Sequence, residues 1–427
     1  MRKIVISDPG LREYGGHHPG MISALTNSEL IAGDAIKLDV YCNNECDINF
    51  IETNRSKKNA IIEHFSTDFY LYFYQSCSIS DLTPYINKLV KEYLDVLLKY
   101  QFSTQINQTI FLYHTLHWEH AMALACAISL FKKQTKNTFQ YCIFLMYSPE
   151  KYSQNGLLDI KRYLNFKVAF NLLQKQHGVR LFAADEELRL SYKKMLNINI
   201  DIHPCGLLNY VGKNSKPIKD DFQQLKSNSA HTKRKKYSIL LFTGDAKVNK
   251  GFLDLPSLLS EIISNLTIEN LTITIQYTIT NESEQLKSVD ETLKGIACND
   301  KRIVIVDRFW THTELHDNFS NADIMLFNYC DKVYMEQSSG VLWLAAMHNL
   351  KMLFLTDTWL NREAERLNCE FQVVKRYEIV DKLNGYLVDC ASNADIILRN
   401  EIEPKNSYRT TLLQDLSVWL DNIYKEK

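Results

Sequence analysis

The chain has 427 residues, more than one hydrophobic core usually supports, so the starting expectation is two domains of roughly 200 residues each. Its composition, 45% hydrophobic and 23% charged, is that of a folded protein in water. With 49 basic and 50 acidic side chains the net charge is −1, which argues against nucleic-acid binding through an overall positive charge.

The cysteines and the N-terminus point to a compartment. Ten cysteines occur without a CxxC pair, Cys42 and Cys46 being the closest, so we expect reduced thiols and no zinc site. Only three apolar residues follow Lys3, far fewer than a signal peptide needs, and the longest apolar helix candidate, 121–131, is too short to cross a bilayer. We expect a cytoplasmic protein without a transmembrane segment, and peripheral contact with a membrane stays open.

The first half alternates short apolar runs with helical patterns, such as residues 81–100 and 120–134. Such alternation predicts a parallel sheet covered by helices on both faces. The expected strands are 3–7, 35–42, 68–74, 109–114, 140–146, 180–184 and 199–204.

The alternation stops at residues 212–236, a polar stretch that we interpret as a linker, and then restarts. The expected strands of the second half are 237–244, 271–279, 302–307, 322–329, 351–357 and 385–389. We therefore predict two Rossmann-like, doubly wound α/β domains, 1–211 and 237–404, that face a cleft, with a closing helix at 408–424 inside a C-terminal segment 405–427. Ligands of open α/β sheets bind beyond the carboxyl ends of the strands, so motifs that follow strands matter most.

The first such motif is DPGLREYGGHHPG, residues 8–20. Gly15 and Gly16 allow a tight turn and close approach to a ligand, and the next helix offers free N–H groups. His17 and His18 could donate hydrogen bonds or exchange protons. An ordinary glycine loop with surface histidines is the alternative.

The second motif is FLYHTLHWEHAMAL, residues 111–124. His114 falls at a strand end, where it would contact substrate or serve as a hydrogen-bonded structural histidine. His117 and His120 follow at three-residue intervals, a poor spacing for metal ligands on one helix, and no HExxH pattern occurs. We expect no metal here.

The third motif is LLFTGDAKVNKGFLDLP, residues 240–256. Gly244 permits a turn, a helix begins soon after Gly251, and Lys247 and Lys250 lie between them. A helix N-terminus together with two ammonium groups suits a diphosphate. Solvated loop lysines are the alternative.

The fourth motif is YMEQSSGVLWLAAM, residues 334–347. Ser338, Ser339 and Gly340 open a helix whose N-terminus favours an anion. Glu336 and Gln337 could bond sugar hydroxyls. A plain serine-capped helix is the alternative.

Together these motifs resemble the retaining GT-B glycosyltransferases of the family-4 type. GDAKVNKGFLDLP is similar to their Gly-x-x-Arg/Lys…Lys-Gly-Phe turn, QSSGVLWLAAM to their Ser/Gly-Gly helix opening, YGGHHPG to their N-terminal acceptor loop, and TDTWLNREAE (356–365) to the segment after their next strand. The family also pairs two glutamates in a Glu-x7-Glu motif. Here the two places are held by Gln337 and Ala345 or, shifted by one residue, by Glu336 and Leu344, so the second glutamate is missing.

The resemblance implies a nucleotide-sugar donor in the second domain, an acceptor in the first, retention at the anomeric carbon and neither cofactor nor metal. Catalytic roles fall to His114, Lys250 and Glu336. The donor contacts that it implies are Gly244, Lys247, Lys250, Asp307, Phe309, Glu336, Gln337, Ser338, Ser339 and Gly340. The acceptor contacts are Gly15, Gly16, His17, His18 and His117.

We therefore expect a glycosyltransferase of polysaccharide or glycoconjugate synthesis, acting on a glycan or a lipid-linked acceptor. Charge stabilisation of the departing diphosphate would supply much of the rate. Two other interpretations stay open: a GT-B sugar-nucleotide epimerase, which needs acid–base groups around the sugar, and a protein that binds glycans or nucleotides without turnover. A zinc hydrolase is a remote alternative.

Overall fold

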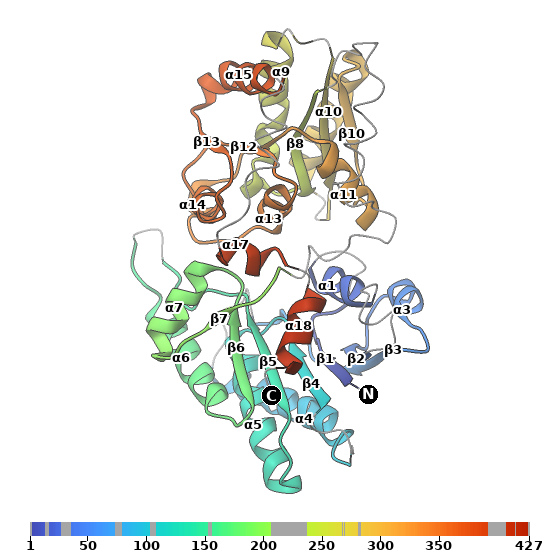
Figure 1. The fold of residues 1–427 in the computed structure, drawn as a ribbon, viewed down its shortest axis with the longest axis vertical. Helices are drawn as coiled ribbons and strands as arrows, with labels where there is room; N and C mark the ends of the chain where they lie inside the picture. Colours follow the sequence, from blue (N-terminus) through green and yellow to red (C-terminus); the bar gives the residue numbers. More distant parts are fainter. Residues whose placement is uncertain are drawn as a thin grey trace. The chain divides into compact units, whose positions relative to one another are not determined.

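A computed structural model describes residues 2–12, 17–26, 36–72, 79–102, 108–152, 156–205, 237–266, 268, 270–280, 283–391, 407–414 and 416–425. The chain forms two compact units, shown in Figure 1. The first comprises Met1–Asn209 with Gln414–Lys427, and the second comprises Tyr210–Leu413. Each unit contains one parallel sheet with helices around it, so the predicted two-sheet α/β architecture is confirmed.

The sheet of the first unit has seven strands in the order β3-β2-β1-β4-β5-β6-β7. The central strands are almost entirely buried, as expected when helices cover both faces. The strands are β1 (Arg2–Ser7), β2 (Ile36–Asn43), β3 (Asn59–Phe65), β4 (Thr109–Tyr113), β5 (Gln140–Leu145), β6 (Val179–Ala183) and β7 (Asp201–Ile202). The helices are α1 (His17–Thr26), α3 (Ile48–Asn54), α4 (Ile79–Leu98), α5 (Trp118–Thr135), α6 (Ile160–Gln174), α7 (Glu186–Leu196) and α18 (Leu416–Lys425).

The sheet of the second unit has six strands in the order β10-β9-β8-β11-β12-β13. The strands are β8 (Tyr237–Asp245), β9 (Leu271–Thr278), β10 (Ile303–Val306), β11 (Ile324–Phe327), β12 (Lys351–Phe354) and β13 (Phe371–Val373). The α-helices are α9 (Leu255–Asn265), α10 (Glu284–Asn299), α11 (His312–Asn321), α12 (Asp331–Tyr334), α13 (Gly340–Met347), α14 (Trp359–Arg366), α15 (Ile379–Ala391) and α17 (Ser407–Leu412). Short 3₁₀ turns are η4 (Val248–Lys250), η5 (Phe252–Asp254) and η6 (Arg376–Glu378).

Both sheets reverse their winding direction at one point. In the first unit the chain adds β2 and β3 on one side of β1, then returns to place β4 on the other side. In the second unit it does the same with β8 and β11. Where two adjacent strands send their connections in opposite directions, their carboxyl ends leave a crevice that commonly binds ligands.

Two predicted strands are wrong. Residues 69–72 form a turn, while 73 and 74 lie outside the described residues, and the strand of this region is β3. Residues 385–389 lie inside α15, and the edge strand is β13. Both errors have one cause, since a short apolar run fits a strand, a helix turn or a packed loop equally well.

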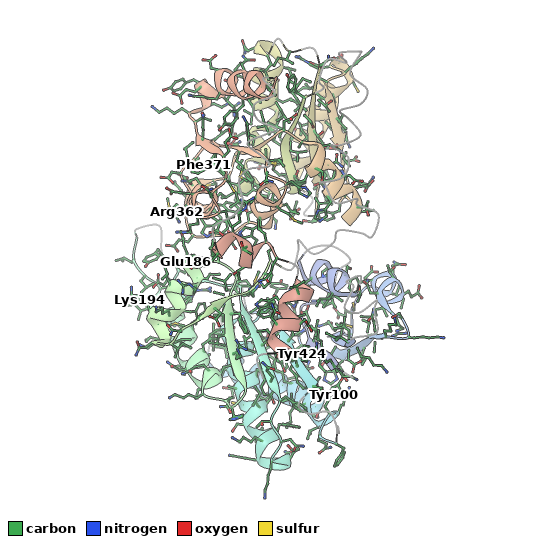
Figure 2. All side chains as sticks on the ribbon, viewed as in Figure 1. Tyr100, Glu186, Lys194, Arg362, Phe371 and Tyr424 are labelled. Carbon is green, nitrogen blue, oxygen red and sulfur yellow. The ribbon has the colours of Figure 1, made fainter. Side chains whose placement is uncertain are left out.

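The helix predicted at 408–424 is two helices. In α17, Arg409 donates from Nη1 to the Leu367 carbonyl oxygen in the second unit (2.7 Å). The chain then enters the first unit at Gln414, and α18 adds Leu416, Trp419, Leu420, Ile423 and Tyr424 to that unit's core. Tyr424, labelled in Figure 2, donates from its hydroxyl to the Lys3 carbonyl oxygen (2.6 Å). The helix is interrupted where the chain changes from one core to another.

Candidate functional site

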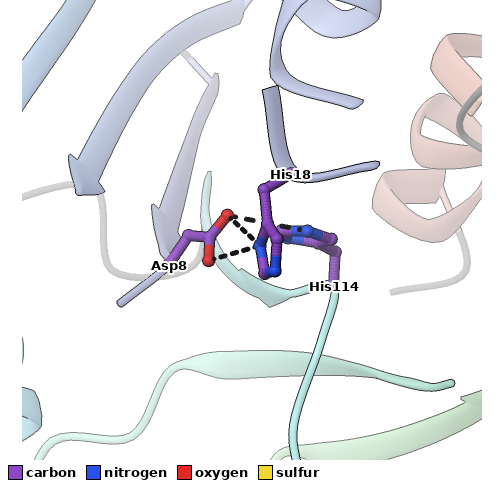
Figure 3. A group of neighbouring side chains, drawn as sticks. All are labelled: Asp8, His18 and His114. Carbon is purple, nitrogen blue, oxygen red and sulfur yellow. Dashed lines mark hydrogen bonds and ion pairs between the residues drawn. The ribbon is translucent and has the colours of Figure 1, made fainter. Parts of the chain in front are cut away.

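Three buried side chains meet at the reversal point of the first sheet. Asp8 follows β1, His114 follows the adjacent strand β4, and His18 comes from the first turn of α1. Only 2% of Asp8, 5% of His18 and 5% of His114 is exposed. We call these three residues the histidine cluster; Figure 3 shows them converging on the Asp8 carboxylate.

The geometry of the histidine cluster centres on Asp8. His18 Nδ1 lies 2.8 Å from Asp8 Oδ1 and 2.9 Å from Oδ2. His114 Nε2 lies 3.6 Å from Oδ2, and the two imidazole rings cross edge to face with their centroids 5.0 Å apart. A carboxylate accepts hydrogen bonds, so we place the ring proton of His18 on Nδ1, from which it is donated to Asp8. His18 Nε2 is then an acceptor.

The neighbours of His18 fix its ring. Its Nε2 faces the Tyr70 hydroxyl at 2.9 Å, so the phenol donates to the imidazole. Gly10 donates its backbone N–H to Asp8 Oδ1 (3.0 Å), and a Cβ on Gly10 would lie 2.4 Å from His18 Cε1. A glycine is therefore required where the loop passes under the ring. Burial lowers the pKa of His18 to about 3, so the imidazole is neutral at physiological pH.

The result is a hydrogen-bonded series that runs from a buried carboxylate through a neutral imidazole to the hydroxyl of Tyr70, a half-buried residue. A base that is oriented by a carboxylate is the arrangement that proton-transferring sites use. This series can pass a proton between the edge of the site and its interior.

The histidine cluster also offers a metal-ligand set. One carboxylate oxygen and two imidazole nitrogens lie within 4.8 Å of one another. Three protein ligands with an open fourth position are typical of catalytic zinc, and bonds of about 2.1 Å at tetrahedral angles separate ligand atoms by about 3.4 Å. The pair of His114 and Asp8 fits that separation, whereas His18 and Asp8, at 2.8 Å, are spaced for a hydrogen bond. A cation could be held only if His18 released its Nδ1 proton and moved outward.

The other residues predicted for the first domain lie elsewhere. Gly15 and Gly16 lie outside the described residues, as does the side chain of His17, which begins α1. His117 is not part of the histidine cluster: its Nδ1 bonds Glu119, and its Nε2 faces Arg162 Nη1 at 3.1 Å.

The second unit has a cationic group at its own reversal point. Lys250 ends η4, just after β8, and its Nζ lies 5.9 Å from the centre of the Tyr329 ring, which follows β11. A Cβ on Gly244 would lie only 3.0 Å from that Nζ, so the glycine leaves room for the ammonium group. Asp245 pairs with Lys247 (3.0 Å), and within the described residues no carboxylate pairs with Lys250. Burial, and then the charge of Lys247, lower the pKa of Lys250 to about 8.

The turn that carries Lys250 is packed tightly against the end of β11. Gly251 has φ +75°, and a Cβ there would lie 2.0 Å from the Asn328 carbonyl oxygen. Cys330 donates its backbone N–H to the Asn249 carbonyl oxygen (2.8 Å). Glycine is required by both the backbone angle and the close approach, and the contacts hold Lys250 in place.

The opening of α13 lies close to this turn. Ser339 is the buried N-cap residue of α13, its side chain makes no capping bond, and Gly340 starts the helix. Burial raises the pKa of Tyr329 to about 12, and the neighbouring Ser339 side chain acts in the opposite direction. Ser339 therefore lies close to Tyr329, whose ring Lys250 approaches. Ser338 is half-buried, whereas Glu336 and Gln337 are exposed.

The loop after β10 connects to the same place through a residue that the sequence did not single out. Gln276, near the end of β9, accepts from the Gly244 N–H (2.9 Å) and donates to the Arg308 carbonyl oxygen (2.7 Å). Asp307 and Phe309 flank that carbonyl and are exposed, Asp307 pairing with Lys294 at 2.8 Å. The available signal was a glutamine in a strand whose other residues are apolar, aromatic or threonine.

Asp8 and Tyr70 were also missed. Asp8 directly follows the first strand, which is a recognisable position for a functional side chain. Tyr70 gave no such signal, because it belongs to the aromatic run that was interpreted as a strand.

Among the described residues, none of the helices has the length and apolar character needed to cross a membrane.

No protein family matches the sequence, and no curated protein matches it either. Solved structures do match over both units. A glycosyltransferase from Rickettsia africae ESF-5 covers 100% of this chain and 98% of its own at 13% identity, with a TM-score of 0.60. UDP-GlcNAc 2-epimerase from Neisseria meningitidis, bound to UDP-GlcNAc, covers 100% of both chains at 12% identity, with a TM-score of 0.54. Anabaena HepE, in complex with UDP, covers 100% of both at 13% identity, with a TM-score of 0.55.

These similarities define the class of fold. The chain has the GT-B fold, two parallel-sheet α/β domains, as the sequence predicted. Its structural neighbours include glycosyltransferases and UDP-sugar epimerases, and identities of 12–13% establish the fold alone.

Proposed function

We propose that the protein is a glycosyltransferase that moves a sugar from a nucleoside-diphosphate donor to a hydroxyl group of a glycan or a lipid-linked acceptor. The observation that carries the proposal is Lys250, a desolvated ammonium group that lacks a carboxylate partner within the described residues. Keeping such a charge away from water is unfavourable unless a counter-ion compensates for it. A diphosphate supplies that charge.

The surroundings of Lys250 suit a diphosphate in shape as well as in charge. Gly244 has no side chain that could cover the Lys250 ammonium group. The N–H groups at the start of α13 favour an anion. Two structural neighbours bind UDP or a UDP-sugar, so a uridine nucleotide is the first donor to try. The loop 307–309 would lie near the base.

In the proposed reaction the bond between the anomeric carbon and the diphosphate oxygen breaks, and a bond to the acceptor oxygen forms. The acceptor's proton leaves with the diphosphate, whose growing negative charge Lys250 stabilises. The resemblance to family-4 enzymes favours retention of configuration. The reaction needs no cofactor besides the donor and the acceptor. The pathway would be polysaccharide or glycoconjugate synthesis. We place it in the cytoplasm, where free cysteines such as those described here persist.

The test is a thermal-shift panel of UDP, GDP, ADP and their sugar conjugates on the wild type, Lys250→Met and Lys247→Met. A ligand at 100 times its Kd stabilises the folded state by about 2.7 kcal/mol. We expect one nucleotide to raise the wild-type midpoint, Lys250→Met to abolish the rise, and Lys247→Met, whose ammonium pairs with Asp245, to keep most of it. A rise that survives in Lys250→Met, or no rise with any nucleotide, would refute the donor site.

The chain of Asp8, His18 and Tyr70 favours a second candidate, a sugar-nucleotide epimerase. Epimerisation removes a proton from a sugar carbon and returns one, so it requires the acid–base groups that this chain offers. Incubating the binding nucleotide sugar with and without acceptor sugars, followed by NMR of the products, separates the two: an epimerase inverts the free donor, whereas a transferase consumes it only with acceptor. A nucleotide that binds without either change identifies a binding protein.

A further inference from the structure

Helix α6 is apolar on two opposite faces. One face packs inward through Phe166, Ala169, Phe170 and Leu173, which are fully buried. The other face, which we call the α6 ridge, consists of Ile160, Leu164, Val168 and Leu172, whose exposed fractions are 64, 51, 50 and 43%. These four residues recur every fourth position and therefore form one continuous row along the helix. An apolar face of this length in water indicates a surface that something covers.

The α6 ridge is edged with positive charge. Lys161, Lys167 and Lys175 are exposed, and at 100° per residue Lys161 and Lys175 project on the same side of the helix as the ridge, with Lys167 just beside it. Within the described residues these lysines form no ion pair. Helix α6 has no acidic residue in a chain whose net charge is −1. The neighbouring helix α7 exposes Leu190 and Lys194, the latter labelled in Figure 2.

Two nearby charges do not belong to this surface. Asp159 is the N-cap residue of α6 and accepts from the Arg162 N–H (2.9 Å). The Arg162 side chain turns inward, where Nη2 donates to the Ser148 carbonyl oxygen (2.8 Å). The exposed face thus has lysines interleaved with aliphatic side chains and no carboxylate among them.

We propose that the α6 ridge docks the first unit on the surface of an anionic lipid bilayer, independently of the reaction that the protein catalyses. Aliphatic side chains enter the boundary between headgroups and acyl chains, and the lysines pair with lipid phosphates. A basic helix with one apolar row lies in the plane of such an interface in this way.

Charge decides against a second copy as the occupant. In a two-fold dimer the same patch meets itself, so Lys161, Lys167 and Lys175 would face the same lysines of the partner. The centre of a stable protein interface is also depleted of charge and buries about 800 Å² per partner, whereas this face is a single row with lysines inside its outline. An anionic membrane both buries the apolar row and neutralises the lysines.

The experiment is co-sedimentation of the full chain with two kinds of vesicle: phosphatidylcholine alone, and three parts phosphatidylcholine with one part phosphatidylglycerol. Two variants alter the surface: Leu164→Ser with Val168→Ser, and Lys161→Gln with Lys167→Gln. Their matched controls are Val418→Ser, an equally exposed valine of α18 (53%), and Lys132→Gln with Lys133→Gln, two exposed lysines of α5. All positions are at the surface, so unchanged thermal midpoints are expected.

We expect the wild type to bind the anionic vesicles, to bind phosphatidylcholine alone much more weakly, and to be released by salt. Each lysine near an anionic surface contributes roughly fivefold in affinity, so the double lysine variant should bind about 25-fold more weakly. The double serine variant should lose binding, and both controls should bind as the wild type does. Equal binding by the ridge variants and their controls, no binding to anionic vesicles, or lipid-free dimerisation that Leu164→Ser with Val168→Ser abolishes would each overturn the proposal.

Discussion

Replacing Lys250 with methionine should make the unliganded protein more stable while it abolishes nucleotide binding. The reason is the cost of keeping an ammonium group in a desolvated place. The pKa of Lys250 is lowered from 10.5 to about 8, first by burial and then by Lys247. The folded state therefore disfavours the charged form, whereas the unfolded chain does not. Methionine has a similar length and no charge to desolvate.

The magnitude follows from the two pKa values. Each tenfold difference in proton affinity corresponds to about 1.4 kcal/mol, so the interval from about 8 to 10.5 amounts to roughly 3 kcal/mol. The ammonium keeps partial solvent contact, and its interaction with the Tyr329 ring is worth about 0.5–1 kcal/mol in the opposite direction. A net gain of roughly 2 kcal/mol remains for Lys250→Met at pH 7.

The destabilisation by the Lys250 ammonium depends on pH. Between about pH 8 and 10.5 the unfolded chain holds the proton and the folded protein does not, so wild-type stability rises through this window. The advantage of Lys250→Met should thus be full at pH 7 and reduced to about a quarter at pH 10. Because the chain forms two compact units that need not unfold together, the assay is urea-dependent hydrogen exchange of peptides from β8 and β11, which reports the second unit alone.

Lys247→Met is the control variant. Lys247 is exposed and paired with Asp245, and its charge contributes less than burial does to the lowered pKa of Lys250, so Lys247→Met should raise stability at pH 7 by clearly less than Lys250→Met does. A Lys250→Met protein that is less stable than the wild type at pH 7, or equally more stable at both pH values, would show that the Lys250 ammonium is well solvated. The case for a diphosphate counter-ion would fall with it.

Gly251→Ala should destabilise the second unit by about 2–4 kcal/mol in urea unfolding, because its φ is +75° and its Cβ would meet the Asn328 oxygen, whereas Gly295→Ala, with open space around it in α10, should be neutral or stabilising. Nucleotide affinity should fall as pH rises through about 8, and calorimetry at pH 8 in buffers of different ionisation enthalpy should detect proton uptake on binding; uptake of none would contradict the role of Lys250. For the epimerase candidate, whose acid–base groups include this phenol, Tyr70→Phe should keep nucleotide binding and lose turnover by about 10²–10⁴-fold together with one limb of the pH–rate profile; an unchanged profile would make the phenol a packing group. Turnover should persist after dialysis against EDTA, and a loss that zinc restores would assign the histidine cluster to a metal.

The parts of the fold that could be predicted are those encoded by local pattern. Alternating apolar runs and helical periods gave both parallel sheets, since central strands such as β1 and β8 must be buried on both faces. The turn at Gly244 and Gly251 was visible for the same reason, because glycine is required there by backbone geometry rather than by distant contacts.

The parts that could not be predicted depend on partners far away in the sequence. Residues 385–389 have the composition of a strand, and only packing places them in α15. The final helix is divided because its halves belong to different cores. The hydrogen bonds among Asp8, His18 and Tyr70 join residues separated by up to 62 positions. The order of the strands in the sheet brings these residues together, and no local sequence pattern contains them.

The two units use one topological position for opposite chemistry. In each sheet the functional group follows the first strand and faces the end of the strand across the reversal point, β1 with β4 and β8 with β11. At that position the first unit holds a carboxylate with neutral imidazoles, and the second holds a desolvated ammonium group. A carboxylate with imidazoles binds hydroxyl groups and moves protons, whereas an ammonium group binds an anion. The fold fixes where each group lies, and the side chains fix its chemistry. Under the proposed function, the phosphate-bearing substrate would bind to the second unit and the hydroxyl-bearing one to the first.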